Sequence, residues 1–260
     1  MACEFYSTFF GKSLSNVDYN KLYDQYEKIY EDAISLGLFM EGGIKEKDHL
    51  NFWCLGYVLE PEIYIESGVF IGTSMHAFIK SPNIKKTVGI DPYLDLLKVP
   101  KEDIPGCILI DDKDFSQIKF DHEEKESLVY FDDHINTADR IIQAYDNNFR
   151  YVLFDDSTGF EGVCQRLYPA IPTVPMIMNC ELLSPGDELS WSFQSESIDS
   201  TRVLLSISQG FIDKCLLSKK LIKQFVKTPD LGEFLPQSIP EKVVDTSKYL
   251  VELELNDSDG

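Results

Sequence analysis

The sequence predicts an α/β fold with a doubly wound, mostly parallel sheet. From Glu62 onward, short apolar runs that end in acidic residues alternate with segments of helical periodicity. The runs are continuously apolar, which is typical of parallel strands that helices cover on both faces. The chain has 260 residues, 43% of them hydrophobic, which is enough apolar material for one packed core.

Two helices are expected before the sheet. Residues 16–36 place tyrosine, leucine and isoleucine at helical spacing on one face, with acidic and lysine side chains opposite, as in an amphipathic helix. A second helix is predicted from Asp48 to Leu59, since the residue that precedes Pro61 disfavours the helical conformation.

Five apolar runs are predicted to form strands of the sheet, and residues 73–80 and 136–149 are predicted to be helices between them. Right-handed crossovers bring the carboxyl ends of parallel strands to one edge, so the acids that end these runs are expected to converge. The predicted strands are residues 62–66, 86–91, 106–112, 127–133 and 150–156.

The last third of the chain has weaker patterns, with several prolines in a loop-like region. Residues 202–208 favour a strand, residues 213–227 favour a basic helix, and residues 248–255 alternate as a late strand does.

The charge of the chain excludes several classes of partner. Asp and Glu number 44 against 24 Lys and Arg, which gives a formal net charge of −20. Phosphate backbones and anionic membranes require clustered basic residues, so neither a nucleic acid nor a membrane is an expected partner. The sequence shows no signal peptide and no apolar stretch near about 20 residues, which predicts a cytoplasmic location. The six cysteines are far apart, which favours free thiols over disulfides or a zinc site.

The segment ESGVFIGTS, Glu66 to Ser74, follows the first predicted strand and opens a helix. Gly68 and Gly72 allow a tight turn and a close approach of the backbone to a ligand, although an ordinary strand-to-helix turn has the same composition. Asp91 ends the second strand, where an acid can accept hydrogen bonds from both hydroxyls of a ribose. A helix cap or a solvated strand end is the alternative for Asp91.

Together these segments resemble the class I S-adenosylmethionine-dependent methyltransferases, which have a Rossmann-like sheet. The resemblance implies that S-adenosylmethionine is the cofactor and that Asp91 binds its ribose. It also implies that Asp111 or Asp112, after the third strand, approaches the adenine. The residues that it assigns to the cofactor loop are Glu66, Gly68, Gly72, Thr73 and Ser74.

Four carboxylates end two strands that are predicted to be neighbours: Asp132 and Asp133 in FDDH, and Asp155 and Asp156 in FDD. Their mutual repulsion is costly unless water or a cation relieves it. Oxygen ligands suit a hard divalent ion such as Mg²⁺. The alternative is that these are solvated acids on the loops of a very acidic protein.

Residues 48–165 also resemble a narrower group, the metal-dependent sugar O-methyltransferases of macrolide pathways and the cephalosporin-hydroxylase-like family. That resemblance implies a Mg²⁺ site made by Asp155, Asp156 and either Asp132 or Asp133, with His134 as the base. The family pattern is Asp-x-x-His, whereas here the histidine directly follows the two acids. His134 could instead cap the following helix.

The expected function is methyl transfer from S-adenosylmethionine to a hydroxyl group of a sugar, so the expected partner is a small-molecule or glycan acceptor. The alternatives are a metal-dependent phosphohydrolase and a non-catalytic, methyltransferase-like binding subunit. His49, His76 and His122 are expected to be structural. The expected organisation is an N-terminal helical segment, a cofactor-binding core, and a C-terminal part of the same domain with lid or self-association elements, over residues 1–60, 61–165 and 166–260.

Overall fold

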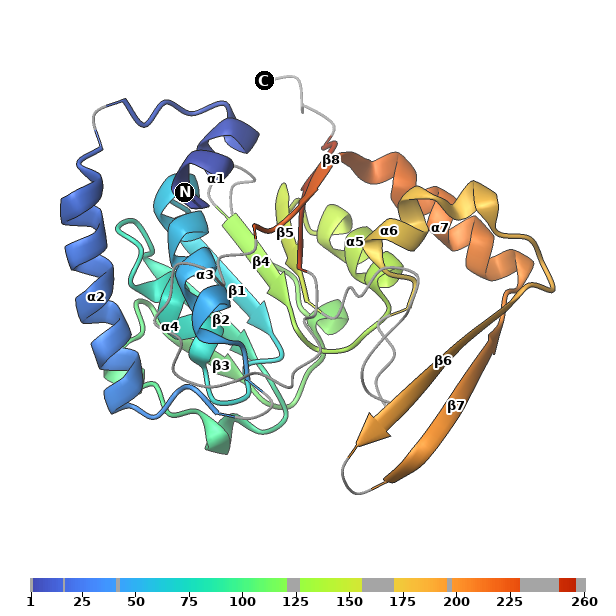
Figure 1. Cartoon of the computed structure of the whole chain (residues 1–260), viewed down its shortest axis with the longest axis horizontal. Helices are drawn as coiled ribbons and strands as arrows, with labels where there is room; N and C mark the ends of the chain where they lie inside the picture. The colour runs from blue at the N-terminus through green and yellow to red at the C-terminus, as the bar shows by residue number, and fades with distance from the viewer. Residues whose placement is uncertain are drawn as a thin grey trace. The chain divides into compact units, whose positions relative to one another are not determined.

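A computed structural model gives the fold of the chain (Figure 1). In the described part of the chain, no helix combines the length and the apolar character needed to cross a membrane. The structure describes residues 2–15, 17–40, 43–120, 127–155, 171–195, 198–229 and 248–255.

The main sheet has seven strands in the order β3-β2-β1-β4-β5-β9-β8 and is mostly parallel, which confirms the predicted α/β, Rossmann-like fold class. β1 pairs in parallel with β2, and β2 with β3, whereas β9 is antiparallel to both β5 and β8. The strands are β1 Ile63–Ser67, β2 Lys86–Ile90, β3 Ile108–Ile110, β4 Ser127–Phe131, β5 Tyr151–Phe154, β8 Ile222–Lys227 and β9 Tyr249–Leu253.

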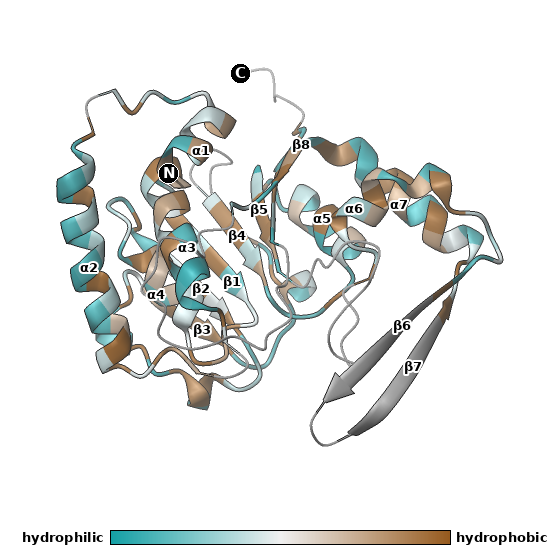
Figure 2. Cartoon of the chain, in the orientation of Figure 1, coloured by the Kyte–Doolittle hydropathy of each residue, from teal (hydrophilic) through white to brown (hydrophobic). Residues whose placement is uncertain are grey.

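The chain divides into two compact units, and the first comprises residues 1–128 and 228–240. Its helices are α1 Ala2–Phe10, α2 Tyr19–Ser35, α3 Glu46–Leu59 and α4 Thr73–Ile79. The helices predicted at residues 16–36 and 48–59 are confirmed as α2 and α3. In Figure 2 hydrophilic and hydrophobic residues alternate along α2, as the amphipathic pattern predicts. Aromatic stacking joins α3, α4 and β1, because Phe78 lies 5.2 Å from Phe52 and 4.5 Å from Tyr64 between ring centroids.

The second unit comprises residues 129–227 and 241–260. Its helices are α5 Thr137–Asp146, α6 Val174–Met178 and α7 Gln209–Leu221, and its separate antiparallel hairpin is β6 Glu188–Ser195 with β7 Ile198–Ser206. The predicted strands at residues 202–208 and 248–255 are confirmed by β7 and β9. Short 3-10 helices across the chain are Leu94–Leu96, Lys101–Asp103, Phe115–Gln117 and Cys180–Leu182.

The helix predicted over residues 213–227 is wrong in its second half. α7 ends at Leu221, and residues 222–227 form β8, which pairs with β9. Ile222, Phe225 and Val226 are β-branched or aromatic, and such residues favour a pleated surface. Their pairing with β9 satisfies the backbone hydrogen bonds that a longer helix would otherwise make.

The free-thiol prediction is confirmed for the five cysteines that the structure describes: Cys3, Cys54, Cys107, Cys180 and Cys215. Cys164 lies outside the described residues.

Candidate functional site

The loop between β1 and α4 adopts a backbone that most side chains resist. Gly68, Phe70 and Gly72 have φ angles of 92°, 48° and 86°, all in the left-handed region. A Cβ atom on Gly72 would lie 2.5 Å from Cδ1 of Leu97 and 3.0 Å from Cγ2 of Val99. Position 72 therefore requires glycine both for its backbone angle and for lack of space.

The side chain of Glu66, near the end of β1, holds this loop through hydrogen bonds. It is fully buried, and its two carboxyl oxygens accept hydrogen bonds from the hydroxyls of Tyr64, at 2.8 Å, and Ser74. Burial raises the pKa of Glu66 to about 8, the negative charge of Asp91 adds to the rise, and the two hydrogen bonds oppose it. Glu66 thus ties β1 to the first turn of α4.

Asp91 links the loop to the end of β2. Its Oδ2 accepts a hydrogen bond of 2.8 Å from the backbone N–H of Phe70, and its Oδ1 accepts one of 2.7 Å from the N–H of Tyr93. Asp91 as a whole residue is 8% exposed. Because each carboxylate oxygen has a second lone pair, Asp91 keeps the capacity to accept hydrogen bonds from a ligand.

The segment that follows α2 lies against the same loop, which the sequence did not predict. The Thr73 hydroxyl donates a hydrogen bond of 2.7 Å to the carbonyl of Leu38. Lys98 donates one of 2.6 Å from Nζ to the carbonyl of Gly37, and its own backbone N–H donates to the carbonyl of Ile71 at 3.1 Å. No spacing in the sequence signals these contacts, since the acceptor in each is a backbone carbonyl of a segment that is distant in the chain.

Asp111 and Asp112 are exposed after β3. Their proposed approach to an adenine stays a prediction.

In the second unit, a tyrosine joins the acidic ends of β4 and β5. The hydroxyl of Tyr130 lies 3.2 Å from Oδ2 of Asp132 and 3.0 Å from Oδ2 of Asp155. The backbone N–H of Asp155 also donates to the carbonyl of Phe131 at 3.0 Å. The expectation that acids from these two strand ends lie together is confirmed for Asp132 and Asp155.

Two basic side chains of the same unit compensate these acids. Nζ of Lys248 lies 3.3 Å from Oδ1 of Asp155, and the two side chains are 3% and 8% exposed. Nη2 of Arg140 lies 2.7 Å from Oδ2 of Asp133, with exposures of 1% and 12%. The Arg140 guanidinium also lies over the ring of Phe131, 5.3 Å from its centroid.

The arrangement of these described carboxylates does not fit the predicted Mg²⁺ site. Among the described residues, no three His, Cys, Asp or Glu side chains are grouped so that they could hold a metal ion. Asp133 directs one oxygen to Arg140 and accepts the N–H of Ile135 at 3.2 Å with the other. Asp156, the remaining predicted ligand, lies outside the described residues.

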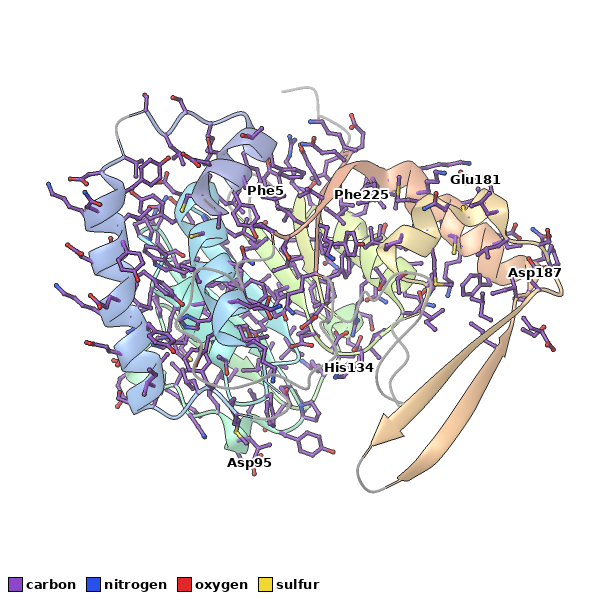
Figure 3. The ribbon with its side chains drawn as sticks, in the orientation of Figure 1. Phe5, Asp95, His134, Glu181, Asp187 and Phe225 are labelled. Carbon is purple, nitrogen blue, oxygen red and sulfur yellow. The ribbon has the colours of Figure 1, made fainter. Side chains whose placement is uncertain are left out.

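His134 lies in the turn between β4 and α5, where Figure 3 labels it. It is half-buried and has a left-handed φ of 57°. The alternative that His134 caps α5 is wrong, because Asn136 is the N-cap and its side chain accepts the N–H of Asp139 at 3.1 Å. The role of His134 as a base stays a prediction.

His49 and His76 form a buried pair in the first unit. Nε2 of His49 lies 3.0 Å from Nδ1 of His76, and both side chains are fully buried. They pack between helices α3 and α4, as expected of structural histidines. His122 lies outside the described residues.

No family model and no curated protein matches the chain. Among solved structures, an O-methyltransferase from Bacillus cereus in complex with SAH is 11% identical, with 96% of each chain covered and a TM-score of 0.46. An SAH-bound methyltransferase from Podospora anserina is 10% identical, with 89% of this chain and 88% of that chain covered and a TM-score of 0.47. The structure described as cmcI-N160 SAH is 20% identical, covers 48% of this chain and 70% of that chain, and has a TM-score of 0.38. Similarities at this level assign neither an activity nor a cofactor to the chain.

Proposed function

We propose that this protein is an S-adenosylmethionine-dependent O-methyltransferase. The observation that carries the proposal is the direct link between the glycine loop and the acid after β2: the N–H of Phe70 donates to Asp91 at 2.8 Å. The resemblance to class I methyltransferases rests on these two segments, and the structure brings them into contact. The strand order of the sheet supports the same proposal.

The glycine loop and the carboxylate of Asp91 suit S-adenosylmethionine as a ligand. Gly68 and Gly72 leave the loop without side chains at two left-handed positions, which allows close approach to the backbone. The carboxylate of Asp91 has lone pairs for ribose hydroxyls beyond those that the two backbone N–H groups use. When bound, S-adenosylmethionine would supply an electrophilic methyl group, and the protein would have to hold an oxygen nucleophile in line with it.

We further propose a sugar hydroxyl as the acceptor. The support is the resemblance of residues 48–165 to sugar O-methyltransferases, together with the polar group that Tyr130, Asp132 and Asp155 form. Carboxylate oxygens accept hydrogen bonds from hydroxyls, so this group could orient neighbouring hydroxyls of a sugar. In the same proposal His134 takes the proton from the reacting hydroxyl.

Isothermal titration calorimetry with S-adenosylmethionine tests the central proposal. Wild-type protein should bind the cofactor, and Asp91→Ala should bind it more weakly. Glu102→Ala is the matched control, since this acid is exposed in a 3-10 helix of the same unit. Absence of binding at millimolar cofactor would overturn the proposal.

A methyl-transfer screen over deoxysugars and their nucleotide conjugates then tests the acceptor. Transfer to a sugar supports the proposal. Cofactor binding without transfer to any glycan favours the binding subunit, and cofactor-independent hydrolysis of a phosphoester favours the phosphohydrolase.

A further inference from the structure

In the second unit, basic side chains of the protein neutralise the acids at the ends of β4 and β5. We define the carboxylate cluster as Asp132 and Asp155, the two acids that the hydroxyl of Tyr130 contacts. The hydroxyl of Tyr130 lies within hydrogen-bond distance of both members and donates its single proton to one of them at a time. Carboxylates that share a partly buried site repel one another, and burial removes the water that would screen them.

A divalent cation would supply positive charge to such a cluster, and Lys248 supplies positive charge at Asp155. Lys248 contacts Asp155 at 3.3 Å and Arg140 contacts Asp133 at 2.7 Å. Both basic side chains are almost fully buried, at 3% and 1% exposure. A buried ammonium or guanidinium is stable only when it is paired, so each contact fixes the basic side chain as well as neutralising its acid.

The position of Lys248 follows from strand pairing. β9 runs antiparallel to β5, and Phe154 is opposite Tyr249. Asp155 directly follows Phe154 and Lys248 directly precedes Tyr249, so continuing the register by one residue sets the acid and the base opposite each other. The salt bridge is therefore built into the sheet and does not depend on a flexible surface side chain.

Both oxygens of Asp155, and both oxygens of the neighbouring residue Asp133, have partners. Asp155 uses Oδ1 for Lys248 and Oδ2 for Tyr130. Asp133 uses Oδ2 for Arg140 and Oδ1 for the N–H of Ile135. A metal ion bound by Asp155 would lie beside the ammonium of Lys248, and the two positive charges would repel each other.

We propose that Lys248 takes the place of a divalent cation at the carboxylate cluster, and that it is the positioning residue that holds Asp155 for the acceptor. The inference rests on the proposed methyltransferase function. It revises the Mg²⁺ dependence that the sequence predicts: the chain's methyl transfer is independent of added divalent metal.

Three variants test the proposal. Lys248→Met removes the ammonium but keeps much of the side-chain volume, and Lys248→Arg keeps the charge. Lys223→Met is the control, because Lys223 also pairs with an acid of β9, Glu252 at 2.9 Å, but lies outside the carboxylate cluster. Thermal melting of each variant identifies those that fold.

Metal binding is measured first, by electron paramagnetic resonance with Mn²⁺ as the probe. Wild-type protein and Lys223→Met should not bind Mn²⁺. Lys248→Met should gain Mn²⁺ binding, because Asp155 loses its compensating charge, and Lys248→Arg should not. This gain would show that Lys248 occupies the place of a cation beside Asp155. Tight Mn²⁺ binding by the wild type that Asp155→Asn abolishes would overturn the proposal.

Methyl transfer is measured second. Wild-type turnover should be unchanged by EDTA, Lys248→Met should lose about a hundredfold in kcat because the acceptor is misplaced, and Lys248→Arg should recover part of the loss. Turnover by the wild type that EDTA abolishes and Mg²⁺ restores would also overturn the proposal. Cofactor titration by calorimetry distinguishes a failure of this proposal from a failure of the proposed function. A protein that does not bind S-adenosylmethionine contradicts the proposed function, whereas a protein that binds it but requires a metal for turnover contradicts only the role of Lys248.

Discussion

The imidazole rings of His49 and His76 share a hydrogen bond of 3.0 Å in the interior of the first unit, and they stack with centroids 5.3 Å apart. The pair continues at both ends. Nδ1 of His49 lies 3.1 Å from the hydroxyl of Tyr26, and Nε2 of His76 lies 3.0 Å from Oδ2 of Asp32. Asp32 in turn pairs with Lys80 at 2.9 Å.

The carboxylate of Asp32 fixes the direction of this chain of hydrogen bonds. An ionised carboxylate only accepts, so Nε2 of His76 must donate and its Nδ1 must accept. Nε2 of His49 then donates to His76, and Nδ1 of His49 accepts from Tyr26. Two neutral histidines satisfy every contact, whereas an added proton on His76 would oppose the donor of His49. These hydrogen bonds hold α2 against α3 and α4.

The first prediction concerns stability in acid. Burial and the neighbouring His76 lower the pKa of His49 to about 3 from 6.5. Between these values the unfolded chain binds a proton that the folded chain does not, so stability is lost as the pH falls below 6.5. The loss from this group is about 1.4 kcal/mol per pH unit. Urea denaturation of the wild type and of His49→Gln, at about pH 7 and about pH 5.5, should show the smaller pH dependence in the variant. Equal slopes would contradict the prediction.

The second prediction concerns Glu66 and has the opposite sign. Its pKa rises from 4.5 to about 8 in the folded protein, mainly because the side chain is buried. Between these values the folded chain holds a proton that the unfolded chain has lost, so stability falls as the pH rises, again by about 1.4 kcal/mol per pH unit. Glu66→Gln removes this titration, and its stability relative to the wild type should increase from about pH 5 to about pH 8. A stability difference between Glu66→Gln and the wild type that stays the same at both pH values would contradict the prediction.

The third prediction concerns the segment that follows α2 and lies against the glycine loop. Nζ of Lys98 donates a hydrogen bond of 2.6 Å to the carbonyl of Gly37, and the hydroxyl of Thr73 donates one of 2.7 Å to the carbonyl of Leu38. If this segment retains the cofactor, Lys98→Met should weaken S-adenosylmethionine binding by about tenfold, since a hydrogen bond to a charged group contributes about 1.5 kcal/mol. The change should appear in the dissociation rate. Lys101→Met, in the exposed 3-10 helix nearby, is the control and should bind as the wild type does. An unchanged dissociation rate in Lys98→Met would contradict the prediction.

The sequence predicted the parts of this fold that depend on local pattern. The apolar strands, the amphipathic α2 and the glycine loop each carry their signal within a short window, and each lies where it was predicted. The strand β8 was missed because its six residues continue the helical pattern of the residues before them, and only the pairing with β9 makes them a strand. A neighbour that is distant in the sequence decided its conformation.

The candidate site divides in the same way. The acids at the strand ends are visible in the sequence, but their counter-ions are not. Lys248 is far from Asp155 in sequence and meets it only because β9 runs antiparallel to β5. Because the sequence shows acids at these strand ends but no lysine or arginine beside them, it predicts a metal ion there. The register of one strand pair supplies a lysine in that position.

The last prediction compares two glycines that share a left-handed backbone but differ in surroundings. A Cβ atom added to Gly11, which has a φ of 63°, would meet nothing within 4 Å, whereas a Cβ atom on Gly72 would lie 2.5 Å from Leu97. Gly11→Ala should therefore lower the free energy of unfolding by about 1–2 kcal/mol, the cost of the left-handed conformation alone. Gly72→Ala adds the cost of overpacking, for a total of about 2–5 kcal/mol. Urea denaturation measures both. Because the loop must shift to admit the extra carbon, Gly72→Ala should also lose affinity for S-adenosylmethionine, whereas Gly11→Ala should keep it. Equal affinities in the two variants would show that the loop does not bind the cofactor.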